Sequence, residues 1–275
     1  MNITAQQVNE LRKATGSGMM DCKKALVEAG GDMEKAVDIL RKKGMKVAAN
    51  RADREATEGV VIAKVSDDHK FAATLMINCE TDFVAKNADF VAYVQSVLDL
   101  AIANRPADAA ALGALKLDGR TVDETIMDQT GKIGEKIQLG HYENLSADST
   151  YAYIHPGNRI ATIAGFNKAG DKFAQAGKDV VMQIAAMAPV AIDKDFVPQN
   201  IIDHEIEIGK DQAREEGKPE AMLEKIAMGK LNKFFKENTL LNQDFVKESK
   251  KSVGQYLKEI DSDLTVTGFK RLALG

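Results

Sequence analysis

The spacing of apolar residues changes along this chain, and the change separates helical segments from sheet-forming ones. Residues 1–43 repeat apolar positions at helical spacing and predict three short helices. Thr4 and Gln7 form a capping box before the first helix, and Asp32 is placed to cap the third. Gly44 follows the last apolar position of the third helix and predicts its end, and residues 44–57 predict a basic linker or a helix extension.

From residue 60 the period becomes two, which predicts antiparallel strands. Hairpin strands are predicted at 60–65 and 71–78, and again at 151–154 and 159–166. A helix is predicted after each hairpin, over about 88–104 and again from residue 180 onwards. A hairpin followed by a helix thus occurs twice and predicts two related units of sheet and helix.

The remaining segments complete an α+β prediction. Residues 107–120 are Ala-rich and predict no regular element, whereas Thr121 and Glu124 form a capping box for a helix through Ile133. A helix at 252–260 and a strand at 264–274 end the chain. The predicted division is a three-helix domain with a basic linker at 1–54, a first core unit at 55–140 and a second at 141–275.

Residues 199–236 predict an excursion from the second unit. Two helices with coiled-coil-like apolar faces flank the turn Gly217–Pro219, which is the pattern of an antiparallel helical hairpin. Such arms usually project and contact other proteins. The sequence leaves open whether this arm mediates self-association.

Composition indicates an ordinary soluble protein. The 275 residues are 44% hydrophobic and 28% charged, which allows a sizeable core. Cys22 and Cys79 form no CxxC pair and lie in apolar stripes, so we expect free, buried thiols in a reducing compartment. Residues 1–20 lack the apolar segment of a secretion signal, and the run 180–192 is too short to span a bilayer. We expect a cytoplasmic protein that contacts no membrane.

The net charge of -4 is unevenly distributed. Residues 1–54 carry eleven basic and seven acidic side chains, and the basic excess concentrates in 41–54. Such a run can bind RNA or an acidic protein surface, but it is more often a solvated linker. No aromatic residues interleave with it to stack on bases, so nucleic-acid binding is the weaker hypothesis.

No pattern of catalytic chemistry is present. The chain contains no P-loop, GxGxxG, GxSxG or HExxH motif, and its four histidines have no metal-ligand spacing with either cysteine. We therefore expect an interaction protein without bond chemistry, metal, cofactor or small-molecule substrate. An enzyme with an unrecognised site is a further alternative.

The stretch Thr81–Asn87 joins the apolar strand over 71–78 to the following helix. Thr81 is a candidate N-cap and Asp82 then lies in the first turn, where the helix dipole favours a negative charge. No local role of this kind explains a phenylalanine at position 83, unless its ring packs into the core.

Three stretches together resemble the elongation factor Ts family. Residues 15–26 are similar to its N-terminal signature, and residues 78–87 to its second signature. The helical hairpin and residues 252–259 fall where the family has them. The resemblance implies a ubiquitin-associated-type three-helix domain, two related core subdomains and a projecting coiled-coil arm.

The resemblance also implies guanine-nucleotide exchange on elongation factor Tu during translation. In the family an Asp-Phe pair enters the partner beside its Mg²⁺ and phosphate site, which assigns this role to the loop Thr81, Asp82, Phe83 and Val84. Partner contacts are also implied for Arg12, Met19, Met20 and Lys23 in the N-terminal helices, and for His155 and Arg159 in the second unit. Met19 in addition continues the apolar stripe of the second helix.

The chain departs from the family in two places. The turn at 156–158 differs from that of many members. Members usually continue past 266–269 into a C-terminal helix, whereas this sequence stops at Gly275, so we expect exchange to persist with weaker partner binding. If Phe83 has the implied role, its ring is solvent-accessible in the free protein.

Overall fold

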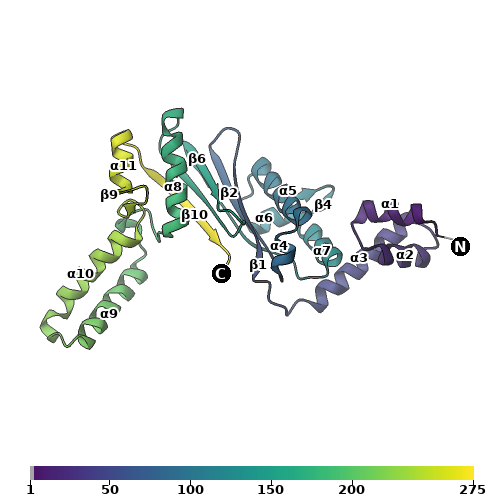
Figure 1. Ribbon diagram of the computed structural model, residues 1–275, viewed down its shortest axis with the longest axis horizontal. Coiled ribbons are helices and arrows are strands. Elements are labelled where there is room, and N and C mark those ends of the chain that lie inside the picture. The colour runs from purple at the N-terminus through teal and green to yellow at the C-terminus, as the bar shows by residue number, and fades with distance from the viewer. Residues whose placement is uncertain (1–2) are drawn as a thin grey trace.

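The computed structural model describes residues 3–275 and has the predicted α+β class, with 52% helix and 22% strand. The molecule is elongated (Figure 1). Its N-terminal helices lie at one end, two antiparallel sheets lie in the middle, and a helical hairpin projects at the other end.

The N-terminal helices are α1 (Ala5–Thr15), α2 (Met19–Glu28) and α3 (Met33–Asn50). Their predicted caps are confirmed: Thr4 and Gln7 form a capping box, and the Asp32 carboxylate accepts the Lys35 backbone N–H at 3.1 Å. The three helices enclose a small core of their own. It consists of Val8, Leu11, Cys22, Ala25, Leu26 and Ala36.

Two predictions for this region are wrong. The third helix does not end at Gly44 but continues to Asn50, so the first part of 44–57 is the helix extension that was one of its two predicted forms. Gly44 is buried inside the helix, because α3 there crosses the backbone of α7 (Val122–Ile133) at Gly131. Met19 does not extend the buried stripe of α2 either. It lies in the first turn at the edge of the domain and is exposed.

The first sheet has the antiparallel order β1 (Glu58–Val65), β2 (Phe71–Cys79) and β5 (Gln138–Ser146). Two long helices, α5 (Ala88–Asn104) and α7, cover one face and bury its apolar residues. The short helix α4 (Asp82–Ala85) follows β2 directly. The segment 107–120, predicted to be irregular, contains α6 (Ala109–Ala114) and a small hairpin of β3 (Lys116–Leu117) and β4 (Arg120–Thr121).

The second sheet has the antiparallel order β10 (Val266–Ala273), β7 (Ile160–Phe166) and β6 (Ser149–Ile154). It is covered by α8 (Ala174–Met187), which starts six residues before the predicted position and follows the 3-10 turn η1 (Asp171–Phe173). The helix α11 (Val253–Ile260) and the short strands β8 (Asp244–Phe245) and β9 (Glu248–Ser252) complete this half. A hairpin followed by a helix therefore recurs, as predicted.

The two sheets pack against each other through the faces that their helices leave free. Val61 and Met76 of the first sheet join Ala161, Ile163 and Leu272 of the second in one buried cluster. The β5 strand crosses position 140, where the sequence predicted the boundary between the two core units. The division into domains stays a proposal.

The hairpin consists of α9 (Gln199–Glu215) and α10 (Glu220–Asn238), preceded by the 3-10 turn η2 (Lys194–Phe196). Gly209 lets the helices approach, because a Cβ placed there would lie 3.1 Å from the Ala227 Cα. At the base, the Leu240 N–H donates to the Ala191 carbonyl at 2.9 Å. Figure 1 shows the two helices extending away from the sheets.

Candidate functional site

Phe83 is an exposed aromatic ring at the end of a buried strand. All nine residues of β2 are buried, and the chain then turns into α4, where Phe83 is 84% exposed. Its neighbours Val84 and Ala85 pack against the core of the first sheet. The predicted exposure of Phe83 is confirmed, and core packing does not explain the residue.

The backbone around Phe83 is hydrogen-bonded. The Lys86 N–H donates to the Asp82 carbonyl, and the Asn87 N–H donates to the Val84 carbonyl, both at 3.0 Å. The Asn87 carboxamide oxygen then accepts the N–H groups of Asp89 and Phe90 and starts α5. The ring is therefore presented by an ordered turn between two rigid elements.

Thr81 does not make the predicted capping bond. Its position is that of an N-cap, but its hydroxyl donates to Glu135 Oε1 at 2.7 Å, and its backbone N–H donates to Glu135 Oε2 at 3.0 Å. Glu135 follows α7, fifty-four residues away in the chain. A tertiary contact thus replaces the local cap. The Thr81–Glu135 pairing could not be predicted from residue spacing in the sequence.

Asp82 carries an accessible negative charge beside the ring. The Lys86 ammonium, which donates to Asp82 Oδ2 at 2.6 Å, holds the pKa of Asp82 below its ordinary value. The Lys86 side chain is largely exposed and that of Asp82 is about half exposed (47%), and a solvent-accessible pair of this kind opens easily. Asp82 is therefore ionised at neutral pH, and its carboxylate becomes available to another charge when the Lys86 pair opens.

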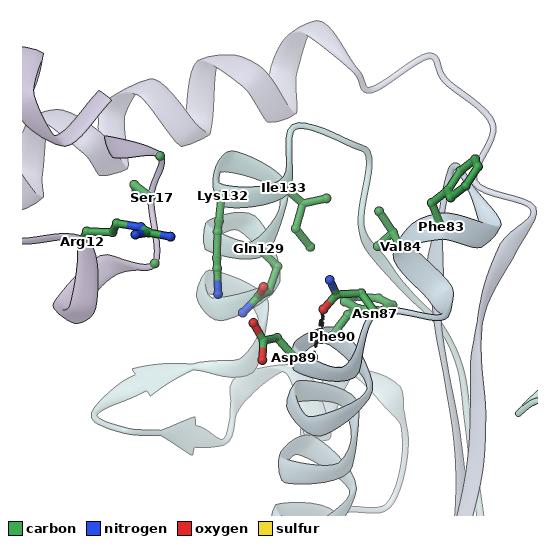
Figure 2. Close-up of a pocket in the computed structure, with 12 residues that line it drawn as sticks. Arg12, Ser17, Phe83, Val84, Asn87, Asp89, Phe90, Gln129, Lys132 and Ile133 are labelled. Carbon is green, nitrogen blue, oxygen red and sulfur yellow. Dashed lines mark hydrogen bonds between the residues drawn. The ribbon is translucent and has the colours of Figure 1, made fainter. Parts of the chain in front are cut away.

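A groove of about 440 Å³ lies beside Phe83 and reaches the N-terminal helices. Figure 2 shows Arg12 and Ser17 on one side, Phe83 and Val84 on the other, and residues of α7 between them. Its lining combines apolar side chains with charged ones. The groove residues are Arg12, Gly16, Ser17, Gly18, Phe83, Val84, Asn87, Asp89, Phe90, Gln129, Lys132 and Ile133. The fold thus brings Arg12 and the Phe83 turn, seventy residues apart, to one surface.

The other predicted N-terminal residues form an exposed strip on α2. Met19, Met20 and Lys23 are all exposed, with Met20 at 63%. Val27 lies one further turn along the same side and is also exposed. Sequence reasoning missed Val27, although its spacing of seven from Met20 placed it on this face.

His155 and Arg159 lie on a separate surface, at the turn between β6 and β7. The His155 Nδ1 is 2.9 Å from the Tyr153 hydroxyl, and the ring lines a second cavity of about 440 Å³ that shares no residue with the groove. Arg159 is not part of that lining, because its guanidinium donates to the Glu58 carboxylate. The structure therefore does not bring these two residues to the Phe83 site.

The basic stretch 41–54 is partly neutralised within the protein. Lys43 pairs with Asp21, and Arg41 lies 3.7 Å from Asp38. Arg51 and Arg54 both face the Glu80 carboxylate, at 2.7 and 3.8 Å. These pairings leave less free positive charge for nucleic acid than the sequence suggested.

Known proteins align with this chain over all or nearly all of its length. A family model described as elongation factor TS matches residues 80–275. The chain is 53% identical to elongation factor Ts of Amoebophilus asiaticus over 100% of both sequences. It is 51% identical to that of Christiangramia forsetii and 52% identical to that of Cytophaga hutchinsonii, over 99% of each sequence.

The chain belongs to the elongation factor Ts family. It is therefore a translation elongation factor, and the resemblance predicted from residues 15–26 and 78–87 is confirmed. The family model begins at Glu80, two residues before Asp82, and so includes Asp82 and Phe83. The alignments with whole elongation factor Ts sequences also include the N-terminal helices.

The described part of this elongation factor Ts member offers neither a cluster of metal ligands nor a membrane-spanning helix. Among residues 3–275, no three His, Cys, Asp or Glu side chains gather as metal ligands. In the same part of the chain, no helix is both long and apolar enough to cross a membrane. The predicted lack of a metal, a cofactor and a membrane contact stays a prediction.

Proposed function

We propose that this protein promotes GDP release from elongation factor Tu by binding that GTPase in its nucleotide-free state. The observation that carries the proposal is the exposed Phe83 ring on an ordered turn beside the ionised Asp82. The protein acts in the cytoplasm, where translation takes place, and makes or breaks no bond itself. Its partner is another protein, and it uses no cofactor or small-molecule substrate.

The mechanism follows from linkage between two ligands of one GTPase. A GTPase holds its nucleotide through Mg²⁺, a phosphate-binding loop and ordered switch segments. A protein that binds the nucleotide-free state more tightly weakens nucleotide binding by the same factor. Exchange therefore needs contacts that compete with the nucleotide site and no reacting group.

Phe83 supplies the apolar part of this competition. The ring is already exposed in the free protein, so its insertion into the partner sacrifices few packing contacts. It gains burial between elements of the partner. The turn that carries it is ordered before binding, so less conformational entropy is lost on association. Both properties favour insertion of the ring near the Mg²⁺ and phosphate site.

Asp82 supplies the electrostatic part. Its carboxylate disturbs the positive environment that the partner provides for Mg²⁺ and phosphate, and it repels the departing nucleotide. The Lys86 pair opens on insertion because it is an exposed contact within one helical turn. Thr81 and Val84 hold this loop, through Glu135 and through the core, respectively.

Further partner contacts flank the loop. We assign Arg12 to the groove contact, and Met19, Met20 and Lys23 to a strip that meets the GTPase's nucleotide domain. Exposed methionines suit this role because their side chains adapt to irregular surfaces. His155 and Arg159 mark a second contact with a more distant domain, in which Arg159 acts by holding the turn against Glu58.

RNA or ribosome binding through 41–54 was the alternative, and no observation favours it. The ion pairs with Asp21, Asp38 and Glu80 reduce the charge available to phosphates. Affinity for RNA that falls steeply with salt would support that alternative.

The test is the rate at which elongation factor Tu releases fluorescent GDP. Phe83→Ala is expected to lower the stimulated rate about ten- to a hundredfold, since burying such a ring is worth about 1.5–3 kcal/mol. The matched control is Phe196→Ala, because Phe196 is 67% exposed on η2, in the other half of the protein. An undiminished rate with Phe83→Ala contradicts the proposal.

A further inference from the structure

Glu80 is a largely buried carboxylate immediately before the Phe83 turn. Only 13% of its side chain is exposed. Its two oxygens accept from Arg51 Nη1 at 2.7 and 2.9 Å, and Oε1 also accepts the Lys136 backbone N–H at 2.6 Å. The Lys136 N–H and the Arg51 guanidinium hold the pKa of Glu80 below its ordinary value, so it is ionised at neutral pH.

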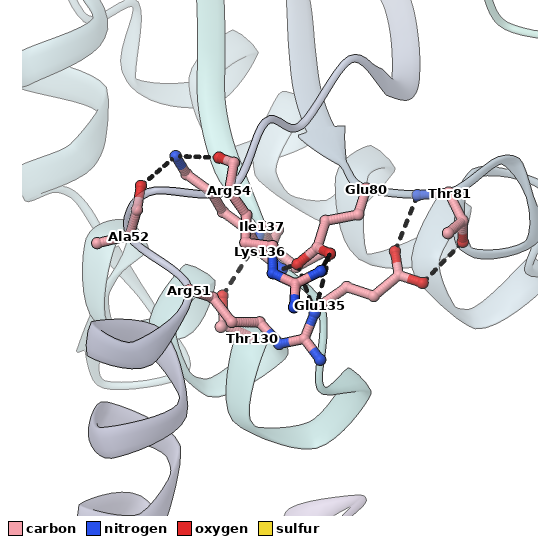
Figure 3. Close-up of polar contacts among 9 residues, drawn as sticks. All are labelled: Arg51, Ala52, Arg54, Glu80, Thr81, Thr130, Glu135, Lys136 and Ile137. Carbon is pink, nitrogen blue, oxygen red and sulfur yellow. Dashed lines mark hydrogen bonds and ion pairs between the residues drawn. The ribbon is translucent and has the colours of Figure 1, made fainter.

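Three distant segments of the chain meet at this carboxylate (Figure 3). Glu135 holds Thr81 through two hydrogen bonds, as described above. The Lys136 ammonium donates to the carbonyls of Ala52 and Arg54, at 2.8 and 2.9 Å. Residues 51–54 are thereby joined to 80–81 and to 135–136. We call this set the junction.

The junction links the two sides of the groove. Residues 51–54 follow α3 and so belong to the N-terminal helices that carry Arg12, whereas 80–81 lead directly into Phe83. The groove is lined by both parts. The junction therefore lies where it can set the position of Phe83 relative to Arg12, although the junction residues themselves do not line the groove.

We propose that Glu80, Glu135 and Arg51 are positioning residues that couple the N-terminal helices to the Phe83 turn, so that both engage the partner as one rigid surface. This inference rests on the proposed function, because it assigns these residues a role in that exchange reaction. Each stabilises the position of the Phe83 turn through contacts within the protein, and none needs to touch the partner. A loosened turn still binds, but it inserts Phe83 less often in the productive orientation.

Hydrogen exchange of the free protein tests the positioning without any partner. Glu80→Ala and Glu135→Ala are expected to raise the amide exchange of residues 81–87 by about tenfold or more, the ratio that one lost charged hydrogen bond produces. The buried strand β2 keeps its protection, which separates local loosening from unfolding. The matched control is Glu143→Ala, because Glu143 lies on β5 of the first sheet, pairs with Lys270 of β10 at 2.7 Å and does not touch the junction.

The same variants are then tested in GDP release at saturating concentration. Glu80→Ala and Glu135→Ala are expected to lower the maximal rate about tenfold while changing partner affinity less. Arg51→Ala is expected to behave alike, and Arg51→Lys to restore part of the rate, since it keeps the charge but not the two-pronged contact. Glu143→Ala keeps both the rate and the protection.

The outcomes separate this inference from the proposed function. Faster amide exchange together with a lower maximal rate supports the inference. Faster amide exchange with an unchanged rate overturns it, and so does a lower rate with unchanged protection. If Phe83→Ala alone lowers the rate while the junction variants change neither readout, the proposed function stands and the positioning role falls. If Phe83→Ala leaves the rate unchanged, the proposed function itself fails.

Discussion

Gly131 of α7 leaves room for α3 at the point where Gly44 crosses it. A Cβ placed on Gly131 would stand 2.5 Å from the Gly44 Cα, a separation that real Cβ contacts do not show. The two helices therefore meet backbone to backbone. This crossing, together with the junction at Glu80, joins the N-terminal helices to the first sheet.

We predict that Gly131→Ala destabilises the protein. The added methyl forces α3 away from α7, and overpacking of this kind costs about 1–3 kcal/mol. Urea unfolding measures the change. The matched control is Gly229→Ala, because Gly229 also lies inside a helix but has open space where its Cβ would be. That control gains up to about 1 kcal/mol from helix propensity. Equal effects of the two substitutions would refute the role of the crossing.

Phe83 and Phe90 are seven residues apart, and we predict that replacing each by alanine has very different effects on the free energy of unfolding. Phe83→Ala changes the free energy of unfolding by less than about 0.5 kcal/mol, because the ring is exposed. Phe90→Ala costs about 3–5 kcal/mol, because its ring is 2% exposed inside the first core. Chemical denaturation of both variants checks this pair. A large loss of stability with Phe83→Ala would mean that the ring packs within its own protein.

The Glu80 contacts predict a weakening of the junction in acid. The folded-state pKa of Glu80 lies below its ordinary value of 4.5, so its contribution is present above that value and is lost as pH falls through the folded pKa. The difference in unfolding free energy between the wild type and Glu80→Gln is therefore expected to shrink from about pH 7 to about pH 3. A constant difference over that range would show that the carboxylate charge is not what stabilises the junction.

Cys79 is predicted to resist alkylation in the folded protein. Burial, with added repulsion from Glu135 and Glu58, raises the pKa of its thiol to about 12, and the thiolate is the reactive form. Because the fold favours the neutral thiol, this contribution to stability is present below the ordinary value of 9.0 and is lost as pH rises towards 12. Iodoacetamide labelling at about pH 8, read by peptide mass, checks the prediction. Labelling of Cys79 without denaturant would contradict it.

Removal of the helical hairpin is predicted to leave both sheets folded. The buried residues of α9 and α10 pack on each other, and the second core, under α8, contains none of them. The base is also tied by the Val190 N–H, which donates to the Asn238 carbonyl at 2.8 Å. A protein with 200–235 replaced by a short Gly-Ser linker should unfold cooperatively near the wild-type temperature. Loss of cooperative unfolding would contradict this, and light scattering on the same variant decides whether the hairpin mediates self-association.

Local chemistry explains why much of the fold could be predicted from the sequence. The capping boxes at Thr4 and Thr121 and the period-two strands depend on residues close together in the chain, and the structure contains them. The β5 strand was missed because a register shift opposite Met76 and Ile77 interrupts its alternation. Gly44 was misread because a glycine that ends a helix and one that admits a second helix look alike in sequence.

The candidate site also contains features that the sequence predicted and features that it did not. The exposure of Phe83 was predicted from the role that the family resemblance implies, because its place in a strand-to-helix turn alone left core packing open, and the exposure is confirmed. Glu80 and Glu135 could not be paired with their partners, because each binds a residue more than twenty-five positions away. No spacing rule connects such residues until the sheet and helices are in place.

The most direct test of the central claim compares the wild type with the Asp82→Ala, Phe83→Ala double variant on elongation factor Tu. Both the affinity for the nucleotide-free GTPase and the rate of fluorescent GDP release at saturation are measured. We predict that the double variant still binds but accelerates release at least about tenfold less than the wild type. Release as fast as with the wild type would contradict the account of the Asp82–Phe83 loop.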